Sequence, residues 1–386
     1  MEKQKLLVVL DPIPQGFSVQ FDLLMSFSKK LSKNKEIFVY SNYIAKNKEL
    51  ILTSIGIHII PPTQSWFSFL IKKYLYDKLN ESLLWGVNWF LDVLNLKLGK
   101  NANVVFDHSF DLSINLSSTI MCKSDLMWIQ GPPFVEVVES MSQSNILAKI
   151  FFKLFRRPLA NGSRLLTLSM TKLSKQVAAN SNFIASRYAG YPFSIDYVIH
   201  TNKEFTFFEP KKKKDKEKYV LTYIGKETDV DTLIKMSELK IKIIAFGAKV
   251  PPGFNLSKLE GKIKFLGRVS ETELITLYSN ALFVAFPFTN EPYGWVPIES
   301  MRCGTPVLSY AREGPSETII NGVTGWLVNN QDEFLKKARM IWEQGSTNLD
   351  PNFCVARGKE FSIEQTISDL LSILEYNGHN EINSYS

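Results

Sequence analysis

Residues 281–328, ALFVAFPFTNEPYGWVPIESMRCGTPVLSYAREGPSETIINGVTGWLV, contain the pattern that decides the fold. Residues 281–286 form a continuous apolar run of strand length, and the loop after it contains two prolines, an asparagine and Gly294. A short helix is predicted next, because Pro297 is tolerated in a first turn and Gly304 is suited to end a helix. This part of the sequence therefore predicts a strand, a loop and a helix in succession.

The same order of elements is repeated directly afterwards. Residues 307–310 predict a second strand, residues 314–315 a second loop, and Ser316 is the candidate N-cap of a second helix. Two successive strand-loop-helix units predict a parallel sheet with both loops at its carboxyl edge, where ligands bind in such folds. Glu291 would lie in the first loop and Glu299 in the first turns of the helix after it, beside N–H groups that favour phosphate.

Two parts of this stretch, EPYGWVPIES (291–300) and MRCGTPVLSYAREGPSETIINGVTGWLV (301–328), resemble the E-x7-E signature and flanks of retaining glycosyltransferase family 4. Both glutamates, the Pro-aromatic-Gly after the first, the Cys-Gly-Thr-Pro turn and the Gly-Pro-x-Glu loop occur in the family's order. The resemblance implies an α/β protein with the GT-B fold, in which two Rossmann-like, doubly wound domains face each other across a cleft. The implied activity is retaining transfer of a sugar from a nucleotide-diphosphate sugar to an acceptor hydroxyl.

Length and composition set wider limits on the class of protein. The 386 residues suffice for two domains, and a hydrophobic content of 45% is typical of globular chains. The formal net charge of +7 favours anionic partners such as nucleotides, phosphates, nucleic acid or an acidic membrane surface. Cys122, Cys303 and Cys354 are far apart and suggest neither a disulfide scaffold nor a zinc site. No apolar run approaches the ~18 residues of a membrane span, so we expect a cytoplasmic protein, soluble or bound at the cytoplasmic membrane face.

Two domains are predicted from the alternation of strand and helix patterns. An amino-terminal, acceptor-binding Rossmann-like domain covers residues 1–205, and a nucleotide-sugar-binding one covers 206–360. The first has a predicted helix at 19–31 and predicted strands at 6–10, 37–40, 57–60, 104–106 and 126–129. The charged run at 207–219 is interpreted as the connection; a nucleic-acid patch is the alternative, but it lacks interleaved aromatics. The amphipathic helix predicted at 361–380 packs back on the first domain.

The resemblance assigns donor-binding roles within the second domain. It directs Glu299 to the ribose hydroxyls and Glu291 to the transferred sugar near its reacting carbon. The backbone between them would meet the sugar and the β-phosphate, and its residues are Pro292, Tyr293, Gly294, Trp295 and Val296. Helix amino termini would stabilise the leaving diphosphate, so neither a metal nor a cofactor is expected.

Three further positions are assigned to the donor by the same resemblance. Gly16 lies in the loop after the first strand, where family glycines let phosphate approach the backbone, and plain turn chemistry is the alternative. Lys226 stands in the place of a family arginine and would neutralise the diphosphate as a point charge. Arg268 ends a loop that lies near the nucleobase in the family.

The Asp-x-Asp pattern at 229–231 could suggest a metal, but its place at a helix start favours capping.

Acceptor activation would come from the first domain. Gln130, in WIQGPP, stands where many relatives have a histidine facing the acceptor hydroxyl, and glutamine cannot act as a base. His108 or Asp107, in a polar cluster with Asp111 after the predicted strand at 104–106, could substitute, and an ordinary hydrogen-bonded histidine is the alternative. Proton transfer to the departing phosphate would make a protein base less necessary. The catalytic candidates are Glu291, His108 and Gln130.

The segment NILAKIFFKLFRRPL (145–159) predicts a basic, aromatic-rich helix. Its basic residues lie along one face and are Lys149, Lys153, Arg156 and Arg157. Such a helix suits a peripheral membrane contact, and an amphipathic helix that covers the core is the alternative. Together with aromatic residues at 66–98, it favours a lipid-linked oligosaccharide or other glycan as the acceptor, as in assembly of surface glycans or protein-linked oligosaccharides. The donor is expected to be UDP- or GDP-linked.

Three other functions remain open from the sequence. A glycoside hydrolase also uses paired carboxylates, but needs no phosphate-binding helix starts. A sugar-nucleotide epimerase shares the two-domain architecture and acts without an acceptor. A non-catalytic protein that binds membranes or nucleic acid follows from charge alone. None of them accounts for the ordered motif at 281–328 as well as a glycosyltransferase does, and no nucleic-acid partner is expected.

Overall fold

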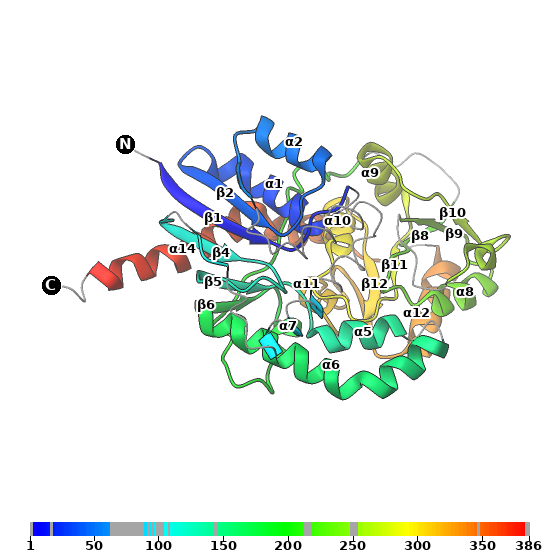
Figure 1. Cartoon of the computed structure of the whole chain (residues 1–386). Coiled ribbons are helices and arrows are strands. Elements are labelled where there is room, and N and C mark those ends of the chain that lie inside the picture. The colour runs from blue at the N-terminus through cyan, green and yellow to red at the C-terminus, as the bar shows by residue number, and fades with distance from the viewer. Residues whose placement is uncertain are drawn as a thin grey trace.

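The computed structural model describes residues 3–15, 18–61, 89–90, 93–94, 96–97, 104–106, 109–142, 146–211, 218–247, 254–345 and 348–382. Side chains are described for these residues except 139–142, 146–149, 151 and 376–382. Within this part of the chain, two parallel β-sheets are flanked by helices (Figure 1).

The amino-terminal sheet is built on buried apolar runs such as residues 6–10, as expected for parallel strands that are covered on both faces. Its strands are β1 (Gln4–Leu10), β2 (Lys35–Ser41), β3 (His58–Ile60), β4 (Leu112–Asn115), β5 (Ser124–Ile129), β6 (Ser174–Ala179) and β7 (Tyr197–Val198). Within the described residues the strand order is β3-β2-β1-β4-β5-β6-β7, and all neighbouring strands run parallel.

Helices connect these strands. They are α1 (Val19–Leu31), α2 (Lys46–Ser54), α5 (Phe134–Ser142), α6 (Ile146–Leu173) and α7 (Asn182–Arg187). Serine N-caps begin two of them, because the hydroxyls of Ser18 and Ser181 accept hydrogen bonds from backbone N–H groups in the first turns of α1 and α7. Helices α5 and α6 lie side by side, and α6 continues through Pro158 (Figure 1).

The carboxyl-terminal sheet repeats the same topology. Its strands are β8 (Val220–Tyr223), β9 (Ile243–Phe246), β10 (Ile263–Phe265), β11 (Val284–Phe286), β12 (Val307–Tyr310) and β13 (Gly325–Val328). Among the described residues they run in the order β10-β9-β8-β11-β12-β13, all parallel. The connecting helices are α8 (Val230–Glu238), α9 (Glu271–Asn280), α10 (Trp295–Arg302), α11 (Pro315–Thr318), α12 (Gln331–Gln344) and α13 (Pro351–Glu360), with a 3-10 turn at Leu256–Leu259.

The last helix, α14 (Ile363–Ile382), returns to the amino-terminal sheet (Figure 1). Its apolar face contributes Ile363, Ile367, Leu370, Ile373 and Leu374 to the same core as β1 and α1. Thr366 on this helix hydrogen-bonds Asn202 and the carbonyl of His200, on the segment between the two sheets. Strand β7 ends at Val198 and β8 begins at Val220, and the division into domains at residues 205 and 206 stays a prediction.

Several local predictions are confirmed and two are wrong. The expected cap at Asp229 is present, since its carboxylate accepts the N–H of Thr232 at the start of α8. Ser316 is not an N-cap: α11 begins after Gly314, and the Ser316 hydroxyl donates to the carbonyl of Glu313. The predicted strand at 104–106 is also wrong.

On the side of β1 where the predicted strand was expected, the structure has β4, which begins eight residues after the start of that predicted strand. Val104 forms only an isolated bridge to Cys122. Asp111 consequently precedes a strand instead of following one. Its carboxylate accepts the N–H of Lys5 at 2.7 Å, at the opposite edge of the sheet from the expected ligand site. Asp111 is thereby removed from the predicted polar cluster.

Both sheets therefore have the Rossmann order, in which the direction of strand addition reverses once. The reversal falls between β1 and β4 in the first sheet and between β8 and β11 in the second. In the part of the chain that is described, no helix is both long and apolar enough to cross a membrane.

Candidate functional site

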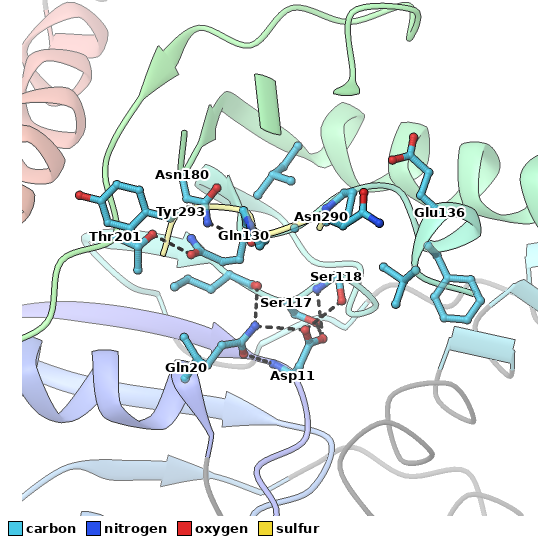
Figure 2. Close-up of a pocket in the computed structure, with 18 of the residues that line it drawn as sticks. Asp11, Gln20, Ser117, Ser118, Gln130, Glu136, Asn180, Thr201, Asn290 and Tyr293 are labelled. Carbon is cyan, nitrogen blue, oxygen red and sulfur yellow. Dashed lines mark hydrogen bonds between the residues drawn. The ribbon is translucent and has the colours of Figure 1, made fainter. Parts of the chain in front are cut away.

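Loops from both reversal points line one cavity of about 530 Å³. Asp11 and Ser117 follow β1 and β4 on the amino-terminal side, and Lys226 and Asn290 follow β8 and β11 on the other. Figure 2 shows Asp11, Ser117, Asn290 and Tyr293 around this space. Ligands of open α/β sheets bind at such reversal points, so the cavity is the candidate functional site.

Two carboxyl-terminal loops are held together by backbone contacts. The N–H of Asp229 donates to the carbonyl of Pro287 at 2.8 Å, and the N–H of Thr289 donates to the carbonyl of Glu227 at 2.9 Å. Thr228 pairs with Phe288 in an antiparallel bridge between the same loops. This pairing fixes the loop that carries Lys226 against the loop that leads to Glu291.

Glu291 is half-buried on the carboxyl-terminal side of the cavity. The pKa of its carboxyl is raised to about 8, first by burial and then by the negative charges of Glu227 and Glu313, while the N–H groups of Tyr293 and Gly294 act in the opposite direction. The carboxylate of Glu313 also accepts the backbone N–H of Glu291 at 2.8 Å. The raised pKa favours the neutral carboxyl of Glu291, which can donate a hydrogen bond, over the carboxylate.

The start of α10 opens onto the cavity. Gly294 is the N-cap and offers no side-chain oxygen, so no capping side chain competes with a ligand for the N–H groups of Trp295 and Val296. Pro292, Tyr293, Gly294 and Trp295 line the cavity. Their loop is anchored to the segment between the sheets, because Trp295 Nε1 donates to the carbonyl of Thr201 at 2.7 Å and the Tyr293 hydroxyl donates to Asn202 at 2.8 Å.

Three residues predicted to bind the donor are not among those that line this cavity: Val296, Arg268 and Glu299. Arg268 is exposed, and Val296 packs against the core beneath the sheet. Glu299 is buried, with Lys203 Nζ 2.7 Å from one carboxylate oxygen and the Tyr278 hydroxyl 2.9 Å from the other. Among the described residues, no group of three or more His, Cys, Asp or Glu side chains is arranged to hold a metal ion.

Asp11 lies on the amino-terminal side of the cavity and was not among the site residues predicted from the sequence. Its carboxylate accepts hydrogen bonds from Gln20 Nε2, the Ser117 and Ser118 hydroxyls and the N–H of Ser118, at 2.7 to 3.1 Å (Figure 2). It also accepts the Thr119 hydroxyl at 3.3 Å. Burial raises the pKa of Asp11 above its usual value, and these hydrogen bonds oppose that shift. An acidic residue directly after the first strand was the available signal.

Gln130 directly follows β5 and lines the cavity. Its side-chain oxygen accepts the Thr201 hydroxyl at 2.8 Å, and its backbone carbonyl accepts Asn180 Nδ2 at 3.0 Å (Figure 2). Gln130 is thus oriented by the segment between the sheets. The other amino-terminal candidates, Gly16, Asp107 and His108, lie outside the described residues.

Glu317, on α11, was likewise not among the predicted site residues. Its carboxylate accepts both N–H groups at the start of α7, from Asn182 at 3.0 Å and Phe183 at 2.8 Å, and contacts His200 Nε2 at 3.3 Å. Burial raises its pKa, but the hydrogen bonds from His200, Asn182 and Phe183 outweigh it and leave the pKa lowered. The side chain therefore joins the two halves of the molecule next to the cavity.

Comparisons with known proteins agree with this architecture. A family model described as Glycosyl transferases group 1 matches residues 255–351, which include Glu291 and Glu299. The D-inositol 3-phosphate glycosyltransferase of Salinispora tropica is 30% identical over 115 residues, which are 29% of this chain and 24% of that protein. The protein of the same name from Mycobacterium bovis is 26% identical over 174 residues, 39% of this chain and 36% of its own length. The chain thus covers well under half of these relatives.

Solved structures match the whole chain at low sequence identity. Sucrose-phosphate synthase from Thermosynechococcus elongatus has a TM-score of 0.62 and 13% identity over 100% of both chains. HepE from Anabaena, in complex with UDP, has a TM-score of 0.61 and 14% identity, covering 97% of this chain and 100% of its own. These likenesses concern the fold, and the fold is GT-B: two Rossmann-like domains with a cavity between them, as predicted from the sequence.

Proposed function

We propose that the protein is a glycosyltransferase that moves a sugar from a nucleotide-diphosphate sugar to an acceptor hydroxyl in this cavity. The observation that carries the proposal is the convergence of Lys226, Glu291 and the start of α10 on one wall of a cavity whose other wall belongs to the amino-terminal sheet. The partial match to glycosyl transferases group 1 and the names of the partial relatives support the same activity.

The donor is proposed to bind against the carboxyl-terminal wall. Lys226 and the first N–H groups of α10 would neutralise the diphosphate, because a cation and a helix amino terminus both stabilise phosphate. The resemblance alone assigns Glu299 to the ribose hydroxyls, because Glu299 does not line the cavity and both of its carboxylate oxygens already have partners. A neutral Glu291 would donate a hydrogen bond to the transferred sugar. UDP is the first nucleotide to test, since HepE, which shares the fold, was solved with UDP, and GDP is the second.

The reaction is proposed to retain the configuration of the anomeric carbon, as the resemblance to family 4 implies. The bond between this carbon and a phosphate oxygen breaks, and the acceptor oxygen bonds to the carbon on the same face. The acceptor proton passes to the departing diphosphate, so the step balances without a metal or a cofactor. Helix dipole and Lys226 stabilise the charge that develops on the leaving group.

The acceptor is proposed to be a lipid-linked glycan presented at the cytoplasmic face of a membrane. Helix α6 supports a peripheral contact, because Ile150, Leu154 and Phe155 are 52%, 71% and 46% exposed. Basic residues lie between and beyond them and are also exposed, namely Lys153, Arg156 and Arg157. An exposed apolar and basic helix face is suited to the headgroups of anionic lipids.

A donor panel tests the proposed reaction. UDP- and GDP-sugars would be screened for nucleotide release with and without lipid-pyrophosphate oligosaccharides, and the product linkage would be read by NMR. We expect release of one nucleotide that depends on the acceptor, with retained configuration. Release of free sugar from a glycoside without any nucleotide would instead indicate a hydrolase, and conversion of the donor alone would indicate an epimerase.

Vesicle sedimentation tests the membrane contact separately. Changing Lys153, Arg156 and Arg157 to serine removes three charges, each worth about 1 kcal/mol near an anionic surface. Binding to anionic vesicles should therefore fall by more than tenfold, whereas serine at Lys336 and Lys337 of α12, which are exposed and half-buried respectively, should have little effect. Equal binding by the wild type and the α6 variant would contradict a contact through this helix.

A further inference from the structure

The cavity extends from Glu291 deep into the amino-terminal half, where most of its wall is apolar, although Ser163 and Thr167 of α6 also line it. Leu166 and Met170 of α6 line it together with Met127 of β5, and all three are buried against the sheet. Trp89 and Phe134 complete this wall, with their rings stacked 3.9 Å apart and an interplanar angle of 8°. A hydrophobic chamber is therefore continuous with the space where the sugar would be transferred.

Close packing fixes the position of this aromatic wall. A Cβ atom added at Gly162 of α6 would lie 3.0 Å from Val93 Cγ1 and 3.1 Å from Trp89 Cη2. The absence of a side chain at Gly162 lets the indole lie directly against the helix. The Trp89 indole is consequently packed in the core and is not a loosely placed ring at the surface.

The carboxylates on this side of the cavity are already engaged by the protein. Asp11 accepts five hydrogen bonds from its neighbours, and Glu136 forms an ion pair with Arg187 at 2.7 Å. The Tyr188 hydroxyl donates to the carbonyl of Gly131 at 3.2 Å. A fully polar sugar placed here would exchange its hydration for apolar contact, which is unfavourable.

We propose that this chamber is a subsite for an alkyl group of the acceptor, attached within a few bonds of the hydroxyl that attacks the donor. The proposal rests on the proposed function, since it defines an acceptor only if sugar transfer occurs at Glu291. It narrows the lipid-linked acceptor to one with only a short head group between the attacking hydroxyl and an alkyl chain that enters the enzyme, and it makes long lipid-pyrophosphate oligosaccharides the poorer acceptors in the donor panel. Each buried methylene improves affinity about fourfold, so a short chain gives measurable selectivity.

Two soluble probes with the same head group measure this selectivity. Binding of n-octyl β-D-glucopyranoside, kept below its micelle-forming concentration, is compared by calorimetry with binding of methyl β-D-glucopyranoside. The octyl glycoside should bind the wild type at least about tenfold more tightly, corresponding to only two or three buried methylenes. Equal affinities would overturn the proposal.

Variants on adjacent positions of α6 locate the alkyl chain. Leu166→Gln places an amide in the wall, and Thr167→Phe fills part of the cavity with a ring at a half-buried position. Each should reduce the affinity for the octyl glycoside to near that of the methyl glycoside. Leu165→Gln is the matched control, because Leu165 is 38% exposed and does not line the cavity, and it should leave both affinities unchanged.

Nucleotide binding separates this proposal from the proposed function. UDP and GDP affinities, measured for the wild type and for folded variants, should not change with the substitutions in α6. Loss of octyl selectivity in Leu166→Gln and Thr167→Phe, with nucleotide binding intact, supports the subsite. If Leu166→Gln fails to fold, the test of the subsite rests on Thr167→Phe. Unchanged octyl glycoside affinity in that variant would overturn the subsite and leave the glycosyltransferase proposal intact. If the wild type binds neither nucleotide, the glycosyltransferase proposal fails, and the acceptor role of the chamber fails with it.

Discussion

Lys203 Nζ lies 2.7 Å from Oε1 of Glu299, and this ion pair joins the segment between the two sheets to α10. The hydroxyl of Tyr278 donates to the other oxygen of Glu299 at 2.9 Å. The same ammonium lies 4.9 Å from the ring centroid of Trp295, whose indole N–H donates to the carbonyl of Thr201. The carboxylate assigned to the ribose is thus oriented before any donor binds.

Lys203→Met should lower the free energy of unfolding by about 3 kcal/mol. The substitution leaves the buried carboxylate of Glu299 without its cation, and breaking a buried ion pair from one side is costly. Urea unfolding at pH 7 measures the loss. Lys30→Met is the matched control, because Lys30 and Glu364 lie 2.5 Å apart but are 40% and 53% exposed, and its loss should be under about 1 kcal/mol. Similar losses in the two variants would contradict the importance assigned to Lys203.

Glu299→Ala should weaken the affinity for the donor nucleotide by about ten- to a hundredfold, because a charge-assisted hydrogen bond contributes roughly 1.5 to 3 kcal/mol. Calorimetry with UDP and GDP measures the affinity. Glu364→Ala, at an exposed carboxylate on α14, is the control and should bind nucleotide normally. Unchanged binding by Glu299→Ala would refute the ribose assignment.

The stability that Glu317 contributes should be lost in acid. Its pKa is lowered in the folded state from 4.5, since His200 and the N–H groups of α7 outweigh the effect of burial. A carboxyl whose folded pKa lies below its unfolded value contributes stability that is present above the unfolded pKa and is lost as the pH falls through the folded pKa. Urea unfolding between pH 6 and 3 should therefore show a steeper loss for the wild type than for Glu317→Gln.

The control for Glu317 is an exposed carboxyl. Glu343→Gln removes one member of a surface pair with Arg339, in which both side chains are about 60% exposed. Its acid profile should follow that of the wild type, because solvent screens such pairs. If Glu317→Gln kept the acid sensitivity of the wild type, the contact across the two halves would not contribute as described.

Elements with a strong local pattern could be predicted from the sequence. The strand at 307–310 and the helix at 19–31 have the predicted bounds, because each is set by its own apolar periodicity and flanking residues. The strand β4 could not be found in this way, since its sequence, LSIN, is short and contains two polar residues, of which Asn115 is buried and Ser113 half-buried. Ser113 and Asn115 are satisfied by Asp125 and by the carbonyl of Ile120, which local sequence does not reveal.

The residues of the candidate site also differ in whether local sequence or distant contacts determine their position. Glu291 and the start of α10 lie in one short loop, so the resemblance could place them, and the structure puts them on the cavity wall. Asp11 and Glu317 depend on partners more than a hundred residues away, Ser117 for the first and Asn182 for the second. Such contacts follow only from the arrangement of the two sheets.

Glu291 should act in its neutral form. Its pKa is raised to about 8, so kcat/KM for sugar transfer should fall by up to about tenfold per pH unit above pH 8 as the carboxyl ionises. In Glu291→Gln the amide keeps a hydrogen-bond donor and does not ionise, so the profile should stay flat there. Nucleotide release between pH 6 and 9.5 measures both profiles.

Glu291→Ala completes this test, because it removes the donor at every pH. Turnover should be low throughout, with a smaller loss of nucleotide affinity. A wild-type activity that is constant above pH 8, or full activity of the alanine variant, would remove Glu291 from the proposed role. The exposed Glu343→Gln variant should reproduce the wild-type profile.

Gly314→Ala should lower kcat/KM for sugar transfer without replacing any side chain that lines the cavity. A Cβ atom at position 314 would lie 2.3 Å from Cα of Tyr293 and 2.5 Å from the carbonyl oxygen of Pro292. Both contacts are to backbone and cannot be relieved by a rotamer change, so the loop before α10 must shift. A displacement of about 1 Å can reduce catalysis by about a hundredfold, and we expect a fall in kcat/KM of that order. Gly190→Ala meets no atom within 4 Å and should be neutral, and wild-type kinetics for a folded Gly314→Ala would show that the loop position is not critical.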